Sequence, residues 1–164
     1  MKKHLFCLLL ALVPMLATAM RPVAVRKMEA EFRQVRSSEL NMRDTVSTGI
    51  FRFDADANLL HWSYTDGTIW QMPTEMMAVL RRVLQGTFYG KNPDFEMHKE
   101  GATLIITPKK KALKKLYNEI HVRFNPFTGY LQELTFYETT GPEPMTDLRG
   151  DIITVDFFNL DVTK

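Results

Sequence analysis

The stretch that decides the fold is residues 49–64, which read GIFRFDADANLLHWSY. In its first half, apolar and polar residues alternate with a period of two, so Phe51 and Phe53 share one face. In its second half, the same alternation places Trp62 and Tyr64 on one face. The central run DADAN is rich in turn-forming residues. The stretch therefore predicts a β-hairpin with one apolar, mainly aromatic face.

Further strands are predicted downstream, because β-branched and aromatic residues form short runs separated by turn signals. These runs are Phe95 to His98, Ala102 to Thr107, Leu116 to Phe124, Tyr130 to Tyr137 and Ile152 to Asn159. A short strand carrying Ile69 and Trp70 is predicted directly after the hairpin.

Two helices are predicted from apolar residues that recur at helical spacing. The first is expected over residues 25–36, with an apolar stripe made of Val25, Met28, Phe32 and Val35. The second is expected between Pro73 and Gly86, with an apolar side made of Met76, Met77, Leu80, Val83 and Leu84. The sum is an α+β domain of about eight strands and two helices. Short connections favour one strongly curved antiparallel sheet, whose concave face the helices would cover.

The N-terminus is expected to be a secretory signal peptide covering residues 1–19. A basic start is followed by an apolar run and the small-residue triplet Ala17-Thr18-Ala19. Cleavage after Ala19 would leave residues 20–164 as one exported domain. Because Lys2 and Lys3 would be lost, the 21 basic residues would fall to 19, equal to the 19 acidic ones. A net charge near zero argues against general nucleic-acid binding.

Several kinds of chemistry have little support in the expected mature domain. The single cysteine, Cys7, lies inside the apolar run of the signal, so disulfides, cysteine nucleophiles and cysteine-bound zinc are excluded. The run from Asp54 to Thr65 starts like a calcium loop, but Leu59 replaces the required glycine and Thr65 the required glutamate, which favours a hairpin turn. His61 and His121 are expected to face solvent. No catalytic motif is found, so no enzyme activity, cofactor or metal is predicted.

Two features remain open from the residues alone. The lysines between Lys109 and Lys115 are expected to form a solvated loop, and docking to anionic lipid or to an acidic partner is the alternative. The aromatic and methionine side chains indicate either an ordinary core or a cavity with adaptable walls. Periodicity does not separate a core from a cavity.

Several motifs together resemble the periplasmic outer-membrane lipoprotein carrier proteins (LolA-like). They are Phe32-x-Gln34, the hairpin 49–64, the run LIITPK at 104–109, and the strands of the C-terminal meander, including Gly129-x-Leu131 and Ile153-x-Val155-x-Phe157-x-Asn159. The family's basic residue and proline before the tryptophan strand are replaced by Asp54-Ala55-Asp56-Ala57, so the role of that basic residue is not carried over.

The resemblance implies an incomplete β-barrel that shelters lipoprotein acyl chains in an apolar cavity under a lid helix. It also implies a monomeric periplasmic shuttle between an inner-membrane ABC-type release complex and an outer-membrane receptor. The residues expected to bind lipid are Phe32, Phe51, Phe53, Trp62, Tyr64, Trp70, Met76, Met77, Leu80 and Leu84. The alternatives are a carrier of another lipid or glycolipid, a non-enzymatic envelope interaction module with a solid core, and a lipid-acting enzyme with a polar cluster in its pocket.

Overall fold

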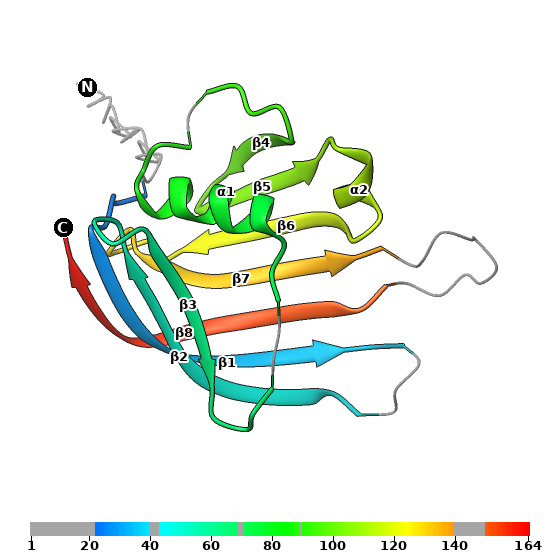
Figure 1. Ribbon diagram of the computed structural model, residues 1–164, viewed down its shortest axis with the longest axis horizontal. Coiled ribbons are helices and arrows are strands. Elements are labelled where there is room, and N and C mark those ends of the chain that lie inside the picture. Colours follow the sequence, from blue (N-terminus) through cyan, green and yellow to red (C-terminus); the bar gives the residue numbers. More distant parts are fainter. Residues whose placement is uncertain (1–21, 40–42, 69–70, 89, 140–149) are drawn as a thin grey trace, which may run out of the picture.

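The computed structural model describes residues 22–39, 43–68, 71–88, 90–139 and 150–164, and these ranges contain eight strands and two helices (Figure 1). The first three strands are β1 (Lys27–Ser37), β2 (Thr45–Asp54) and β3 (Leu59–Tyr64). Helix α1 (Thr74–Leu84) follows, and then β4 (Phe95–Glu100), β5 (Thr103–Pro108), the short α2 (Lys111–Lys114), β6 (Tyr117–Phe124), β7 (Leu131–Glu138) and β8 (Ile152–Thr163).

All eight strands belong to one antiparallel sheet in the order β3-β2-β1-β8-β7-β6-β5-β4. The sheet consists of an N-terminal hairpin arrangement and a C-terminal meander, joined where β1 pairs with β8. This pairing places the first and last strands side by side in the middle of the sheet (Figure 1). The predicted hairpin 49–64 is confirmed, with Phe51 opposite Trp62.

The predicted first helix is wrong, because these residues form β1. Its side chains alternate between exposed and buried, with Met28, Ala30, Phe32 and Gln34 turned inward. The charged residues Lys27, Glu29, Glu31 and Arg33 alternate in the sequence, but Ala30 and Gln34 weaken the apolar half of the pattern, although both lie on the buried face. Tertiary pairing with β2 and β8 therefore overrides the helical spacing of the larger apolar residues.

The sheet is bent at a β-bulge in β8. Register with β1 shifts between Glu29 and Glu31, and Asn159, in the bulged segment of β8, has a positive φ of 51°. The Asn159 side-chain amide donates a hydrogen bond to Glu31 Oε1 at 3.0 Å, which holds the bulge in place. Bulges increase local twist and bend the strand that carries them, so this one helps the sheet curve toward its buried face.

Helix α1 forms where the second helix was predicted, and it packs on part of the inner face. Its buried side chains are Met76, Val79, Leu80, Val83 and Leu84. The prediction that two helices cover the concave face is not confirmed, since the first of them is a strand. The central residues of α1 line a cavity together with side chains of β5, β6 and β7. The lysine cluster forms the short helix α2 and exposed flanks where a loop was expected. The predicted strand at Ile69 and Trp70 lies outside the described residues.

Candidate functional site

The inner face of the sheet carries an aromatic cluster at the end formed by β1, β2, β3 and β8. The Trp62 ring lies 4.6 Å from the ring of Phe51, 5.3 Å from Phe32 and 5.7 Å from Phe157, measured between centroids. Trp62 and Phe157 belong to strands separated by β2 and β1. Adjacent strands are about 4.8 Å apart, so these two residues would be about 14 Å apart in a flat sheet. Their contact therefore shows how strongly this end is curved.

Small residues beneath the rings allow this approach. A Cβ added to Gly49 would lie 2.7 Å from the ring of Phe32 and 2.1 Å from the backbone oxygen of Ser63. Gly49 stands directly opposite Phe32 in the β1–β2 register, and Ala30 stands opposite Phe51. Glycine and alanine are therefore required here by the close packing of the aromatic side chains above them.

One polar interaction lies within this apolar cluster. The Tyr64 hydroxyl donates a hydrogen bond of 2.7 Å to Gln34 Oε1, and Gln34 is buried. Burial raises the pKa of Tyr64 far above its ordinary value, with a smaller contribution from the negative charge of Asp66. The hydroxyl therefore stays neutral and acts as a donor, which fixes the orientation of the Tyr64 ring against Phe32.

A second apolar region lies between α1 and the strands of the meander. It surrounds a small cavity of about 10 Å³, which is closed to any ligand larger than one water molecule. The lining consists of Met72, Met76 and Leu80 from the helical side, and of Ile106, Ile120, Val122, Leu134 and Phe136 from β5, β6 and β7. About 10–15 Å³ holds one water molecule, whereas a cavity of about 150 Å³ is needed to bind a benzene ring. The interior is therefore closed in this conformation, and the cavity expected for a carrier is not open.

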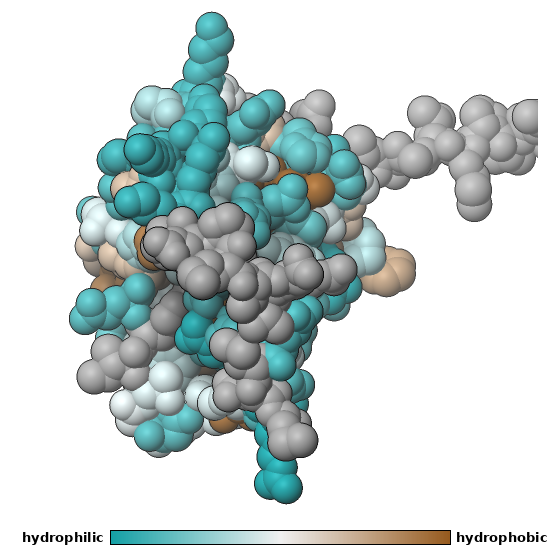
Figure 2. All heavy atoms as spheres, turned by 90° about the vertical axis from the view of Figure 1, so that its right-hand side faces the viewer, coloured by the Kyte–Doolittle hydropathy of each residue, from teal (hydrophilic) through white to brown (hydrophobic). Residues whose placement is uncertain are grey.

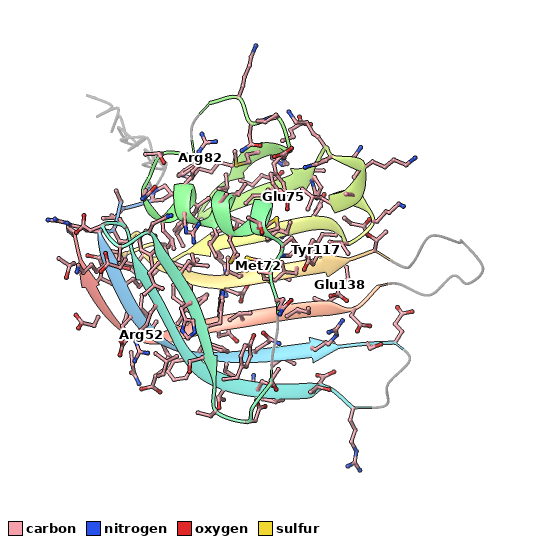
Figure 3. The ribbon with its side chains drawn as sticks, viewed as in Figure 1. Arg52, Met72, Glu75, Arg82, Tyr117 and Glu138 are labelled. Carbon is pink, nitrogen blue, oxygen red and sulfur yellow. The ribbon has the colours of Figure 1, made fainter. Side chains whose placement is uncertain are left out.

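An open groove lies next to this cavity. The groove has a volume of about 370 Å³ and is lined by Leu60, His61, Trp62, Gln71, Met72, Thr74 and Met77. Met72 lines both the groove and the cavity. Figure 3 shows Met72 just before the start of α1, in front of the sheet. Methionine side chains have three flexible bonds and repack easily.

The predicted lipid-binding residues fall into these two regions. The aromatic cluster contains Phe32, Phe51, Trp62 and Tyr64, with Phe53 buried nearby on the same face of β2. Met76 and Leu80 line the cavity, Met77 lines the groove, and Leu84 is buried near the end of α1. Trp70 lies outside the described residues. Phe32 comes from a strand of the sheet, whereas it was expected from a covering helix.

Sequence reasoning missed Met72, Phe157 and the aliphatic side chains of the meander. Met72 lies in a connection without periodicity, so its position depends on the path of the chain before α1. The meander side chains Ile106, Ile120, Val122, Leu134 and Phe136 alternate along their strands, and this pattern was the available signal.

The convex outer face carries charged pairs. Glu29 accepts a hydrogen bond of 2.6 Å from Arg52 Nε, and Arg123 pairs with Glu133. His61 is exposed, and His121 pairs with Glu119 on this face, 3.0 Å away. Among the described side chains no three possible metal ligands come together. None of the described helices is long and apolar enough to span a membrane.

Comparison with known proteins gives structural similarities of low identity. No protein-family model and no curated protein matches the chain. A DUF1329 family protein from Desulfovibrio piger is similar at 9% identity and a TM-score of 0.32, covering 89% of this chain and 90% of that one. A LolA superfamily protein from Nitrosomonas europaea is similar at 7% identity and a TM-score of 0.27, with 90% and 91% covered.

A third solved structure is a putative outer membrane lipoprotein-sorting protein domain from Vibrio parahaemolyticus. It is similar at 6% identity and a TM-score of 0.28, covering 89% of this chain and 88% of that one. Because these TM-scores lie below 0.5, no functional assignment to this chain follows from them.

Proposed function

We propose that this protein is a periplasmic, non-enzymatic carrier that shelters acyl chains between α1 and the inner face of its sheet. The observation that carries the proposal is that an open groove and a closed cavity lined by apolar residues share the side chain of Met72. Because the closed cavity is too small for any acyl chain, α1 has to move away from the apolar surface of β5, β6 and β7 on which it packs, its seat, when a ligand enters. Lipoproteins are the proposed cargo, and another lipid or glycolipid is the alternative.

The energies of the two states are close enough for loading and release. Helix α1 buries five apolar side chains. Exposing them costs on the order of 10 kcal/mol at about 2 kcal/mol each. An acyl chain of about fifteen CH₂ groups gains about 12 kcal/mol when it is buried, at about 0.8 kcal/mol for each group. An acyl chain would therefore replace the helix with a small net change in free energy, as a reversible carrier requires.

Two polar contacts join the ends of α1 to other segments of the described chain, an exposed ion pair and a hydrogen bond between buried residues. Lys110 Nζ donates to Glu75 Oε1 at 3.2 Å, joining the first turn of α1 to the segment after β5. The backbone of Val25 donates to the carbonyl of Leu84 at 2.8 Å, at the other end of the helix. An exposed ion pair contributes little. The packing of the buried apolar side chains of α1 against the sheet therefore determines how readily the helix moves.

A fluorescent fatty acyl probe tests this proposal directly. We expect saturable uptake with a blue shift of the probe, and co-purification of acylated molecules when the protein is isolated natively and examined by mass spectrometry. A protein that binds no probe and carries no acylated ligand would contradict the carrier function.

The closed interior favours one second candidate, a non-enzymatic interaction module of the cell envelope. Such a module needs a solid core, and its function does not require the core to open into a cavity. It predicts that the probe does not bind and that hydrogen exchange in α1 is as slow as in the central strands. Fast exchange confined to α1 would instead agree with a carrier.

A further inference from the structure

A network of three charged side chains lies at one end of the inner face. Arg36 Nη2 donates to Glu138 Oε2 at 2.6 Å, and Arg36 Nε donates to Asp151 Oδ2 at 2.7 Å. One guanidinium therefore faces two carboxylates, all partly buried. Burial raises the pKa of Glu138, although the positive charge of Arg36 opposes this rise.

This network continues the same face that lines the cavity. Arg36 stands opposite Ile153, and Ile153 stands opposite Phe136, so the three side chains point to the same side of the sheet. Phe136 lines the closed cavity, and Glu138 lies two residues further along β7 on the same face. In Figure 3, Glu138 lies near the end of β7, farther from α1 than Met72 does. The polar network therefore borders the apolar space.

Tyr117 provides a second, independent feature at this border. It stands opposite Glu138 in the β6–β7 register, and its ring lies 5.6 Å from that of Phe136. The residue is only 5% exposed, yet its hydroxyl forms no hydrogen bond with any side chain or backbone group in the described ranges. Burial raises the pKa of Tyr117 to about 12, and the negative charge of Glu138 adds to the effect. The hydroxyl oxygen is not among the enclosed side-chain atoms, so a ligand at this border can reach it.

We infer that Tyr117 and Glu138 bind the uncharged polar head group of an acylated ligand, such as the hydroxyl groups of a glycerol ester or an amide. The inference rests on the proposed carrier function, because the acyl chain would occupy the apolar space beyond Phe136. The Tyr117 hydroxyl donates to an oxygen of the head group, and the Glu138 carboxylate accepts from its O–H or N–H.

The charges of the network determine which head groups fit. Arg36 donates through Nε and Nη2 to two carboxylates, so the cluster carries one surplus negative charge. A carboxylate or phosphate head would meet like charge in a partly buried place and would be disfavoured. A cationic amine would be attracted by the surplus negative charge, but it would have to lose its hydration in a partly buried place, which offsets this attraction.

Competition among three ligands with the same chain tests this selectivity. In this assay, a fluorescent acyl probe is first bound to the full-length mature protein. Monopalmitoylglycerol, palmitate and palmitylamine are then each titrated to measure how well they displace the probe. We expect monopalmitoylglycerol to act at about tenfold lower concentration than either charged ligand. Glu138→Gln should reduce the penalty against palmitate, and Tyr117→Phe should weaken monopalmitoylglycerol about fivefold, the effect of one hydrogen bond.

Two matched variants serve as controls. Glu29→Gln breaks an ion pair on the outer face, with Arg52 at 2.6 Å, and Tyr130→Phe removes a hydroxyl outside the inner network. Both should leave the order of the three ligands unchanged. If Glu138→Gln does not fold, Tyr117→Phe still tests the inference, because it removes one oxygen and leaves the ring in place.

The possible outcomes separate the two proposals. Binding of all three ligands with equal affinity, unaltered in both test variants, would overturn the head-group inference and leave the carrier function standing. A preference for palmitate or palmitylamine would also overturn it. If the protein binds neither the probe nor any of the three ligands, the carrier function fails and the inference fails with it.

Discussion

Shortening one side chain in the seat of α1 should both destabilise the protein and strengthen acyl-chain binding. Leu80 is only 3% exposed and lines the closed cavity. Leu80→Ala should lower the free energy of unfolding by about 3 kcal/mol, because burial is lost and the cavity grows. If α1 must move away before a ligand enters, truncating Leu80 also lowers the free energy needed to displace the helix. Much of the lost stability therefore no longer opposes binding. We then expect the affinity for an acyl probe to rise at least about tenfold, since about 1.4 kcal/mol corresponds to a factor of ten.

The assay combines urea denaturation, followed by far-ultraviolet circular dichroism, with titration of the fluorescent probe. Leu113→Ala is the matched control, because Leu113 is 2% exposed and belongs to α2, which packs on β5 and β6. It should lose a similar amount of stability without any gain in affinity. Equal affinities of Leu80→Ala, Leu113→Ala and the wild type would refute displacement of α1. An equal gain in both variants would show that general loosening, and not the helix seat, controls binding.

Three further predictions concern the sheet and the charged network. Gly49→Ala should destabilise the protein by about 1–3 kcal/mol, because the added methyl group would lie 2.1 Å from the backbone oxygen of Ser63 and 2.7 Å from the ring of Phe32; urea denaturation measures this, and an unchanged midpoint would contradict the packing argument. Tyr64→Phe leaves the buried oxygen of Gln34 without its donor and should cost about 1–2 kcal/mol, with the melting temperature as the readout. Because the pKa of Glu138 is raised on folding, its folded form binds more protons between the unfolded and folded pKa values, so its contribution to stability falls as pH rises through that window. Glu138→Gln should therefore gain stability relative to the wild type as pH increases above about 4.5 toward neutrality; a constant difference across this range would be the contrary result.

The parts of the fold that could be predicted are those whose pattern is local. The hairpin 49–64 has alternation on both sides of a turn, and α1 combines a proline at its start with a regular apolar stripe. The meander strands likewise carry turn signals between them. In each of these segments, propensity and burial favour the same structure, so sequence and model agree.

Strand β1 could not be predicted because its buried face is set by distant neighbours. Ala30 fits where the aromatic rings of other strands converge, and Gln34 is buried because Tyr64 donates to it. Neither residue is apolar and large, so the apolar half of the alternation was weak, although charged residues occupy every second position from 27 to 33. The pairing of β1 with β8 joins segments more than one hundred residues apart, and no local pattern encodes such a pairing.

The candidate site shows a further limit of pattern reading. An apolar residue on a strand has the same periodicity whether it fills a core or lines a space that a ligand will occupy. Ile120 and Phe136 now belong to the apolar surface on which α1 packs, and they would contact an acyl chain after α1 moves. Their role therefore depends on the difference in free energy between two occupants of one apolar surface, the helix and the ligand. That difference is small because both occupants bury similar apolar area, so a single truncation such as Leu80→Ala can shift the balance.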